Sequence, residues 1–256
     1  MAGQEIAYNR NVAELTTLPF MLGGFLPSLL WLHFYLRKDL HPEPKKRLIE
    51  TFALGMLLAP LAIAAQWLFA YLGAQFAPGS DIASSSGFFL WAAFSEEVVK
   101  LLAVYYLVIH IPEFDEPVDA MIYLITGALG FAAVENIFVI YKNIPDGVSL
   151  TVQILALRTI GATLLHALSS AIVGYFLALA WFHEPHRRKL IWFGVGAATL
   201  FHFTFNTLLL NLSMLGGWLS SSAILVVMAI LISVLFRKLQ MRSQSKLSTV
   251  SSLPRT

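Results

Sequence analysis

The 256-residue sequence contains no cysteine and few charged side chains. The absence of cysteine excludes disulfide bonds, a thiol nucleophile and cysteine-bound zinc, so any metal would need histidine, carboxylate or amide ligands. Charged residues make up only 12% of the chain and hydrophobic residues 57%, whereas a soluble domain is about one quarter charged. This balance excludes a water-soluble globular fold. The formal net charge of +2 also gives no basic surface for a nucleic-acid partner.

Long apolar runs account for most of the chain. A membrane-spanning helix needs roughly 20 mostly apolar residues, and seven segments joined by short polar loops meet that requirement. We therefore predict an all-α, polytopic helical membrane protein with about seven transmembrane helices. The fifth segment is long enough to break near Gly161, which would give an eighth helix. The predicted spans are residues 17–37, 48–75, 87–110, 118–141, 150–182, 189–211 and 218–237.

The lysines and arginines outside these segments gather on one side of the predicted bundle. The first and fifth loops and the C-terminal tail are basic, whereas the second and sixth loops have no basic residue. Because basic loops stay on the cytoplasmic side, we expect the N-terminus outside and the C-terminus inside the cytoplasmic membrane. This scheme gives an extracytoplasmic tail over residues 1–17, a helical transmembrane domain over 18–240 and a disordered, serine-rich cytoplasmic tail over 241–256.

Ionisable side chains lie within four of the apolar segments. Each costs about 2.5 to 3.5 kcal/mol to insert at the centre of a helix, so each is a candidate functional residue. With a rise of about 1.5 Å per residue, Glu96, Glu135 and His202 all lie roughly 9 to 13 Å below the outer ends of their helices. This agreement in depth favours one shared site in the outer half of the membrane. The ionisable residues are Glu96, Glu97, Lys100, Glu135, Arg158, His166 and His202.

Two adjacent glutamates, Glu96 and Glu97, precede Lys100 by four and three residues in the third segment. At these spacings the lysine can form an ion pair with one glutamate on the same helix face. The other glutamate would then be a general base that removes a proton from water, and either residue fits this role. The alternative interpretation is an ion pair that only joins helices.

Three further side chains complete the candidate site. Glu135 follows a stretch of small residues, where a neighbouring helix can approach closely, although it could also be a hydrogen-bonded packing residue. His166 shares a helix face with Ser170, and His202 shares one with Asn206, because each pair is four residues apart. Such pairs can hold a water molecule, a metal ion or a developing oxyanion.

Two other polar residues in the apolar segments are open to interpretation. Arg158 can anchor its helix at the outer surface, or contact a glutamate or a substrate carbonyl. Gln66 is interpreted as a packing or interface residue. The acidic connection from Glu113 to Asp119 is interpreted as a solvated turn with helix capping, because Pro112 and Pro117 interrupt helices there.

In their order along the chain, these motifs resemble the PrsW family of bacterial intramembrane proteases, which are relatives of the CAAX-processing prenyl endopeptidases. The resemblance extends from about Leu26 to Leu210, whereas the last helix and the tail add nothing to it. The matching pieces are the E-E-x-x-K stretch Glu96 to Lys100, the F-x-x-x-E stretch Phe131 to Glu135, His166 to Ser170, and His202 to Asn206, supported by Pro42-Glu43-Pro44 and by Glu113 to Ala120.

The resemblance implies an intramembrane endopeptidase that cleaves a membrane-tethered protein, typically an anti-sigma factor, near the outer face of the cytoplasmic membrane. Asn206 matches the residue that helps to stabilise the oxyanion in the prenyl endopeptidases. Glu135 stands where those relatives have histidine, so a prenylated substrate is not expected. The implied catalytic residues are Glu96, Glu97, Glu135, His166, His202 and Asn206, with Lys100, Arg158 and Ser170 in supporting positions.

The implied chemistry has two forms. Members of the family are described both as metalloproteases and as glutamate-dependent hydrolases, and the sequence permits either. A divalent metal such as zinc would be held by His166, His202 and Glu135. The expected partners are the membrane-tethered protein substrate and the lipid bilayer, and the sequence does not specify an oligomeric state.

Two functions of other classes stay open on the sequence. Buried carboxylates and histidines also serve transporters and proton relays. Such proteins often contain inverted repeats and paired broken helices, and the sequence shows no internal symmetry of that kind. A non-catalytic membrane scaffold would keep every phenotype after substitution of the glutamates.

Overall fold

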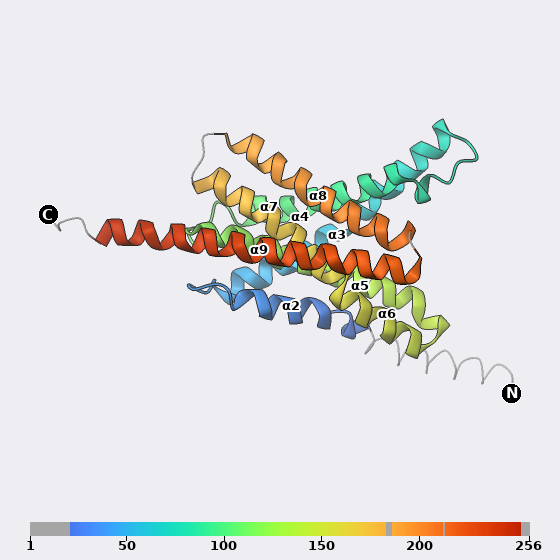
Figure 1. Ribbon diagram of the computed structural model, residues 1–256, viewed down its shortest axis with the longest axis horizontal. Coiled ribbons are helices and arrows are strands. Elements are labelled where there is room, and N and C mark those ends of the chain that lie inside the picture. Colours follow the sequence, from blue (N-terminus) through green and yellow to red (C-terminus); the bar gives the residue numbers. More distant parts are fainter. Residues whose placement is uncertain (1–20, 183–185, 212, 252–256) are drawn as a thin grey trace.

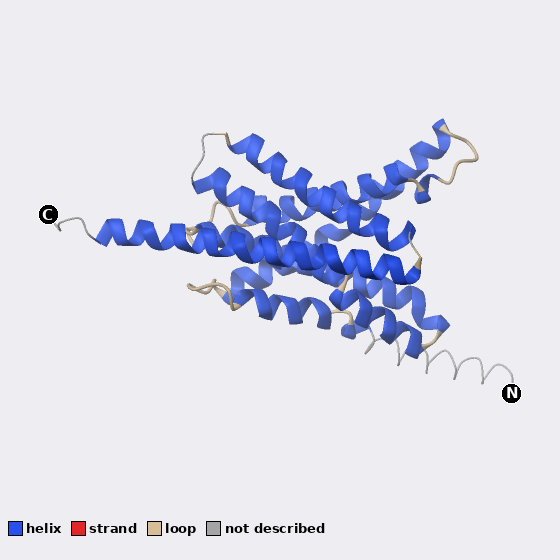
Figure 2. Cartoon of the chain, in the orientation of Figure 1, coloured by secondary structure: helices blue, strands red, loops and turns tan. Residues whose placement is uncertain are grey.

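The computed structural model describes residues 21–182, 186–211 and 213–251, and every regular element in these ranges is helical (Figure 2). The helices form an elongated bundle from which the C-terminal part of the last helix projects (Figure 1). The predicted all-α fold is therefore confirmed. The elements are α2 (Leu26–Leu36), α3 (Lys45–Phe76), α4 (Ser86–Leu107), α5 (Pro117–Asn143), α6 (Val148–Ile160), α7 (Ala162–Phe182), α8 (Arg187–Asn211) and α9 (Met214–Ser251), with short 3-10 helices at Ile82–Ser84 and Ile144–Asp146.

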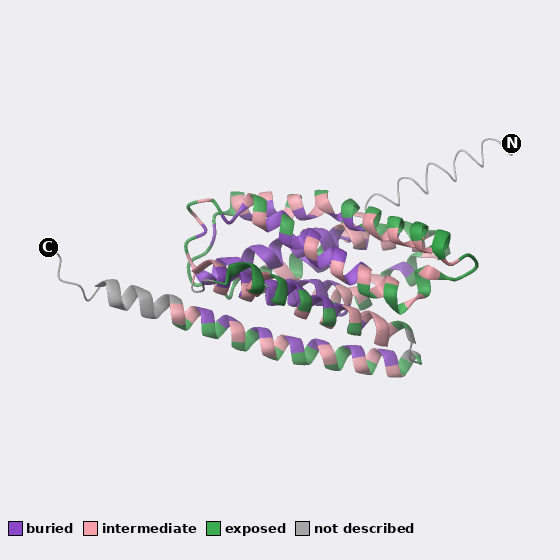
Figure 3. Cartoon of the chain, turned by 90° about the horizontal axis from the view of Figure 1, so that it is seen from above, coloured by how far each residue is buried: buried purple, intermediate pink, exposed green. Residues whose placement is uncertain are grey.

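The outer surface of the bundle is apolar and its interior is partly polar. The side chains of Leu57 and Trp67 on α3 are 73% and 66% exposed, whereas Glu97 on α4 is fully buried. Buried residues gather in the centre of the bundle (Figure 3). An apolar exterior around buried charged groups suits a chain whose solvent is lipid. Five stretches are long and apolar enough to cross a membrane: Lys45–Phe76, Pro117–Asp146, Val148–Phe182, Arg187–Leu210 and Leu215–Arg242.

Two of the seven predicted spans differ from these five stretches. Helix α4 has 22 residues but carries the three charges of Glu96, Glu97 and Lys100, which lower its hydropathy. Within the described residues, the apolar helical stretch that contains α2 runs from Met21 to Leu36, so it covers only part of the predicted first span. The predicted first span, residues 17–37, begins outside the part of the chain that the structure describes.

The fifth predicted span divides at Gly161, as its length allowed. Helix α6 ends at Ile160 and α7 begins at Ala162, and Gly161 between them has a ψ of −95°, outside the α-helical range. The break changes the course of the chain, so α6 and α7 lie beside α5 as separate helices (Figure 1).

Helix α5 lies at the centre of the bundle and packs closely against α3 and α7. A Cβ atom on Gly130 would lie 2.0 Å from the carbonyl oxygen of Phe52, and one on Gly55 would lie 2.0 Å from that of Gly127. Only glycine permits this backbone contact between α3 and α5. The small residues before Glu135 thus provide the close approach that the sequence predicts.

The connections between the helices alternate between the two ends of the bundle (Figure 1). The connection 37–44, which leads into the basic start of α3 at residues 45–47, lies at the same end as the connection 108–116 and the C-terminal part of α9. The connections 77–85 and 144–147 lie at the other end. This is the alternation that the predicted topology requires, and the side of the membrane that each end faces stays a prediction.

The described part of the C-terminal tail is helical, and the expected disorder of residues 241–256 stays a prediction. Helix α9 continues to Ser251, and residues 252–256 lie outside the described part. After Gly217 the sequence has neither glycine nor proline until Pro254, so nothing in its composition ends the helix earlier. The predicted extracytoplasmic tail, residues 1–17, also lies outside the described ranges.

Candidate active site

Four helices bring ionisable side chains into one buried cluster. Helix α4 supplies the two adjacent glutamates, α5 supplies Glu135, α7 supplies His166 and α8 supplies His202. The glutamates of α4 and both histidines are no more than 7% exposed. Five of the six residues expected to be catalytic therefore lie together, as their common depth indicates. They are Glu96, Glu97, Glu135, His166 and His202.

Glu97 is held by hydrogen bonds on both carboxylate oxygens. Its Oε1 accepts from Nζ of Lys100 at 2.8 Å and from Oγ of Ser169 at 2.9 Å, and it lies 2.9 Å from Nδ1 of His202. Its Oε2 accepts from Oγ of Ser170 at 3.4 Å. These contacts leave Glu97 little capacity for a further ligand, so its geometry is that of a residue that orients the His202 ring.

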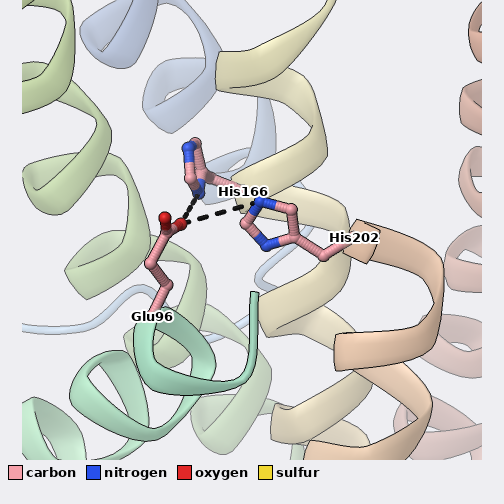
Figure 4. Close-up of side chains that lie close together, drawn as sticks. All are labelled: Glu96, His166 and His202. Carbon is pink, nitrogen blue, oxygen red and sulfur yellow. Dashed lines mark ion pairs between the residues drawn. The ribbon is translucent and has the colours of Figure 1, made fainter. Parts of the chain in front are cut away.

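Glu96 has one oxygen without a hydrogen-bond partner. Its Oε1 accepts from Nε2 of Gln66 at 3.1 Å, whereas Oε2 is buried and accepts no hydrogen bond. This Oε2 lies 3.6 Å from Nε2 of His202 and 3.9 Å from Nδ1 of His166 (Figure 4). It is also 3.9 Å from Nζ of Lys100, an ion pair without a hydrogen bond. Buried polar atoms without a partner are rare in native structures. The free oxygen of Glu96 therefore faces the two imidazole rings in a position suited to a ligand.

A second carboxylate orients the His166 ring. Nε2 of His166 lies 2.9 Å from Oε2 of Glu135, which also accepts from a terminal guanidinium nitrogen of Arg158 at 3.0 Å. Nε of Arg158 donates to Oδ1 of Asn136 at 2.7 Å. Of the interpretations open for Arg158, the structure shows the contact with a glutamate. Helix α6 delivers this arginine because the chain breaks at Gly161.

Lys100 lies inside the cluster. Its Nζ is 2.8 Å from Oε1 of Glu97 and 2.7 Å from Nδ1 of His166, and it stands 5.1 Å from the centroid of the Phe131 ring. An ammonium group only donates hydrogen bonds, so Nδ1 of His166 accepts and its Nε2 donates to Glu135. The lysine thus compensates part of the negative charge of the glutamates.

Three side chains of the cluster fit a divalent metal ion. Glu96, His166 and His202 each offer one ligand atom, and these atoms lie within 4.8 Å of one another. The other nitrogen of each ring faces a carboxylate, Glu135 for His166 and Glu97 for His202. Metal-binding histidines are commonly oriented in this way, and a carboxylate with two imidazoles is a donor set that zinc accepts. In this geometry the carboxylate of the group is Glu96 and not the expected Glu135. Glu135 instead contacts the other nitrogen of the His166 ring.

The remaining expected residues are Ser170 and Asn206. Ser170 contacts Glu97, and Asn206 lies on α8 one turn after His202, where its half-buried side chain makes no hydrogen bond to another described residue. The interpretation of Gln66 as a packing residue missed its bond to Glu96. The sequence did contain a signal for this residue, a lone amide side chain within an apolar segment. The glutamates were recognised as candidates by the same kind of signal.

Comparisons with known proteins report similarity over most of the chain. The sequence profile of a family described as "PrsW family intramembrane metalloprotease" matches residues 43–235, which include the whole cluster. A Geobacillus kaustophilus protein named Protease PrsW is 32% identical over 188 residues, which cover 73% of this chain and 78% of the relative.

Two further curated relatives carry the same name. The one from Oceanobacillus iheyensis is 28% identical over 199 residues, covering 77% of this chain and 85% of the relative. The one from Bacillus subtilis is 26% identical over 195 residues, covering 74% and 82%. No solved structure matches the chain.

Proposed function

Because the chain belongs to the PrsW family of intramembrane proteases, we propose that it hydrolyses a membrane-tethered protein with water activated beside Glu96, His166 and His202. The observation that carries this proposal is the unpartnered Oε2 of Glu96, which is buried and faces both imidazole rings. A buried acceptor without a donor provides a place for a reacting water molecule.

Each residue of the cluster has a role in this proposal. Glu96 accepts the proton of the attacking water at Oε2, and the water oxygen bonds to the carbonyl carbon of the scissile peptide. Glu97 and Glu135 hold the rings of His202 and His166 in position. Asn206, one turn after His202, donates to the developing oxyanion. When the carbon–nitrogen bond breaks, the proton on Glu96 passes to the leaving amine.

The same cluster supports the metal-dependent form of the chemistry. Glu96, His166 and His202 are the residues that would hold a divalent ion such as zinc, and the ion would supply Lewis acidity to the scissile carbonyl. In that form Glu96 is a ligand and cannot also be the free base. The metal content of the purified protein therefore decides which role Glu96 has.

The proposal places the cleavage near the outer face of the cytoplasmic membrane. The connection 37–44 with the adjoining basic residues 45–47 at the start of α3, and the C-terminal part of α9 with its lysines and arginines, share one end of the bundle. With that end cytoplasmic, the N-terminus is outside and the cluster lies in the outer half of the membrane. A membrane-tethered anti-sigma factor is a substrate of the corresponding kind.

Cleavage of a membrane-tethered reporter by the purified chain in liposomes tests the proposal. We expect Glu96→Gln to lower the rate by about a hundredfold or more, because it removes the proton acceptor. The matched control is Glu50→Gln, which changes a partly exposed carboxylate paired with Arg47 on α3. Cleavage by Glu96→Gln at the wild-type rate would contradict the proposal. Proton flux through liposomes without peptidase activity would instead support a transporter.

A further inference from the structure

Two apolar grooves flank a single row of residues on α9. The first has a volume of about 380 Å³ and lies between α9 and α2, with Leu164 of α7 also in its lining. The second has a volume of about 400 Å³, is shallow, and is lined by side chains of α9 alone on the other side of the row. Both grooves share Ala229, Ser233 and Arg237. These residues are spaced by four and therefore form one row along the helix.

The first two residues of the row, Ala229 and Ser233, present little polar surface, and the charged residue is Arg237 at its end. Ala229 is small, and the hydroxyl of Ser233 donates to the carbonyl oxygen of Ala229 at 2.8 Å, so it is already satisfied within the helix. The first groove is lined by Trp31, Phe34 and apolar side chains of α9. Polar groups thus concentrate at one end of each groove, where Arg237 lies.

That end is cationic. Lys38 lies at the end of the first groove with its Nζ 5.2 Å from the centroid of the Phe34 ring, and Arg237 lies at the end of both grooves. Both side chains are exposed. Within the described ranges, neither is in an ion pair with a carboxylate. Gln240 donates to the carbonyl oxygen of Lys38 at 2.6 Å and ties α9 to the end of α2 there.

We propose that these grooves bind one anionic phospholipid, with one acyl chain in the groove between α9 and α2, the other along the exposed apolar face of α9, and the phosphate between Lys38 and Arg237. An apolar groove and an adjoining apolar helix face that converge on two unneutralised cations match the two chains and the single charged headgroup of such a lipid. Basic pockets between helices on the cytoplasmic side of a membrane are suited to anionic headgroups. The site lies on α2 and α9, so the inference does not depend on the proposed peptidase activity.

Lipid binding by the purified full-length chain tests the proposal without any substitution. We expect phosphatidylglycerol to remain bound in native mass spectrometry and to raise the temperature of thermal unfolding in detergent, because a ligand of the folded state stabilises it. Phosphatidylcholine has the same two chains and no net charge, so we expect it to do neither. Equal retention of the two lipids would overturn the proposal.

Two variants locate the site. Lys38→Gln combined with Arg237→Gln is expected to weaken phosphatidylglycerol binding by about tenfold or more. Ala229→Phe places a ring on the row and is expected to displace the acyl chains while both cations remain. The matched control is Arg188→Gln combined with Lys189→Gln, which removes the same charge from exposed positions on α8 that line neither groove.

Three results would overturn the assignment. The first is wild-type lipid preference in the Lys38 and Arg237 variant, and the second is an equal loss of binding in the α8 control. The third is a dimer that forms through the grooves and is abolished by Ala229→Phe without any change in bound lipid. Because Ala229→Phe keeps both cations, it tests the grooves even if the charge variant fails to fold.

Discussion

The Nζ atom of Lys100 lies 2.7 Å from Nδ1 of His166, and both side chains are buried at the centre of the bundle. This nitrogen is also one of the three ligand atoms that could hold a metal ion. Since the ammonium donates to Nδ1, it occupies the lone pair that a metal would need. A proton-bearing lysine and a divalent ion therefore compete for one side of the His166 ring.

We predict that Lys100→Met binds zinc at least about tenfold more tightly than the wild type, because the competing charge and donor are gone. The same change leaves Glu97 without its cation and is expected to lower the stability by about 3 to 5 kcal/mol. Zinc titration against a chelating dye measures the first effect, and thermal unfolding in detergent measures the second. Lys142→Met, at an exposed position on α5, is the control. Identical zinc affinities would show that the lysine does not compete.

The two adjacent glutamates are predicted to differ in what they stabilise. Glu97→Gln breaks a buried pair with Lys100 and should lower stability by about 3 to 5 kcal/mol. Glu96→Gln alters a carboxylate whose Oε2 accepts no hydrogen bond and lies 3.9 Å from Nζ of Lys100, against 2.8 Å for Glu97, so it should lower stability less than Glu97→Gln does while activity falls about a hundredfold or more. Thermal unfolding and reporter cleavage on the same preparations separate these effects. A reversed pattern, with Glu96→Gln the less stable variant, would refute this division.

The metal-dependent form of the chemistry predicts about one divalent ion per chain in the wild type and none in His166→Ala or His202→Ala, because each removes one of three ligands. His186→Ala, which changes an exposed histidine before α8, should retain the ion. Elemental analysis after purification in a chelator-free buffer gives the ratio. An active wild type without metal would assign the reaction to Glu96 as a base.

The contact between α3 and α5 gives a prediction about stability alone. Gly130→Ala places a methyl group 2.0 Å from the carbonyl oxygen of Phe52, so the helices must separate. We expect a loss of about 1 to 3 kcal/mol or more. Gly196→Ala is the control, because a Cβ there meets nothing within 4 Å. Thermal unfolding of the two variants compares them, and equal unfolding temperatures would mean that the close contact is not needed.

The sequence predicted the class of fold and the membership of the cluster for a physical reason. Burial of charge in a membrane is costly, so polar residues within apolar segments can be recognised from the sequence alone. The constant rise of a helix then turns sequence position into depth, which brought Glu135 and His202 to the level of Glu96, with His166 nearer the middle of the membrane. The break at Gly161 could be anticipated because the fifth segment is longer than a span needs.

The sequence could not reveal the contacts that depend on rotation about each helix axis. Neighbouring residues on a helix point about 100° apart, so Glu96 and Glu97 face different partners although they share a depth. Only the packing shows that Glu97 is enclosed by Lys100, two serines and His202, while Glu96 keeps a free oxygen. The contact of Gln66 with Glu96 could not be predicted for the same reason, because a different rotation of α3 would have directed this side chain toward lipid.

By itself, then, the sequence determined a helical membrane protein, the approximate spans and which ionisable residues lie at one depth, because hydropathy and helical rise are properties of the chain. The tertiary structure decided which atoms meet. It placed Arg158 on Glu135, Lys100 on His166 and the free oxygen of Glu96 before both rings. These contacts depend on how four helices are rotated and packed against one another. Spacing along the sequence does not show which side chains of distant segments come into contact.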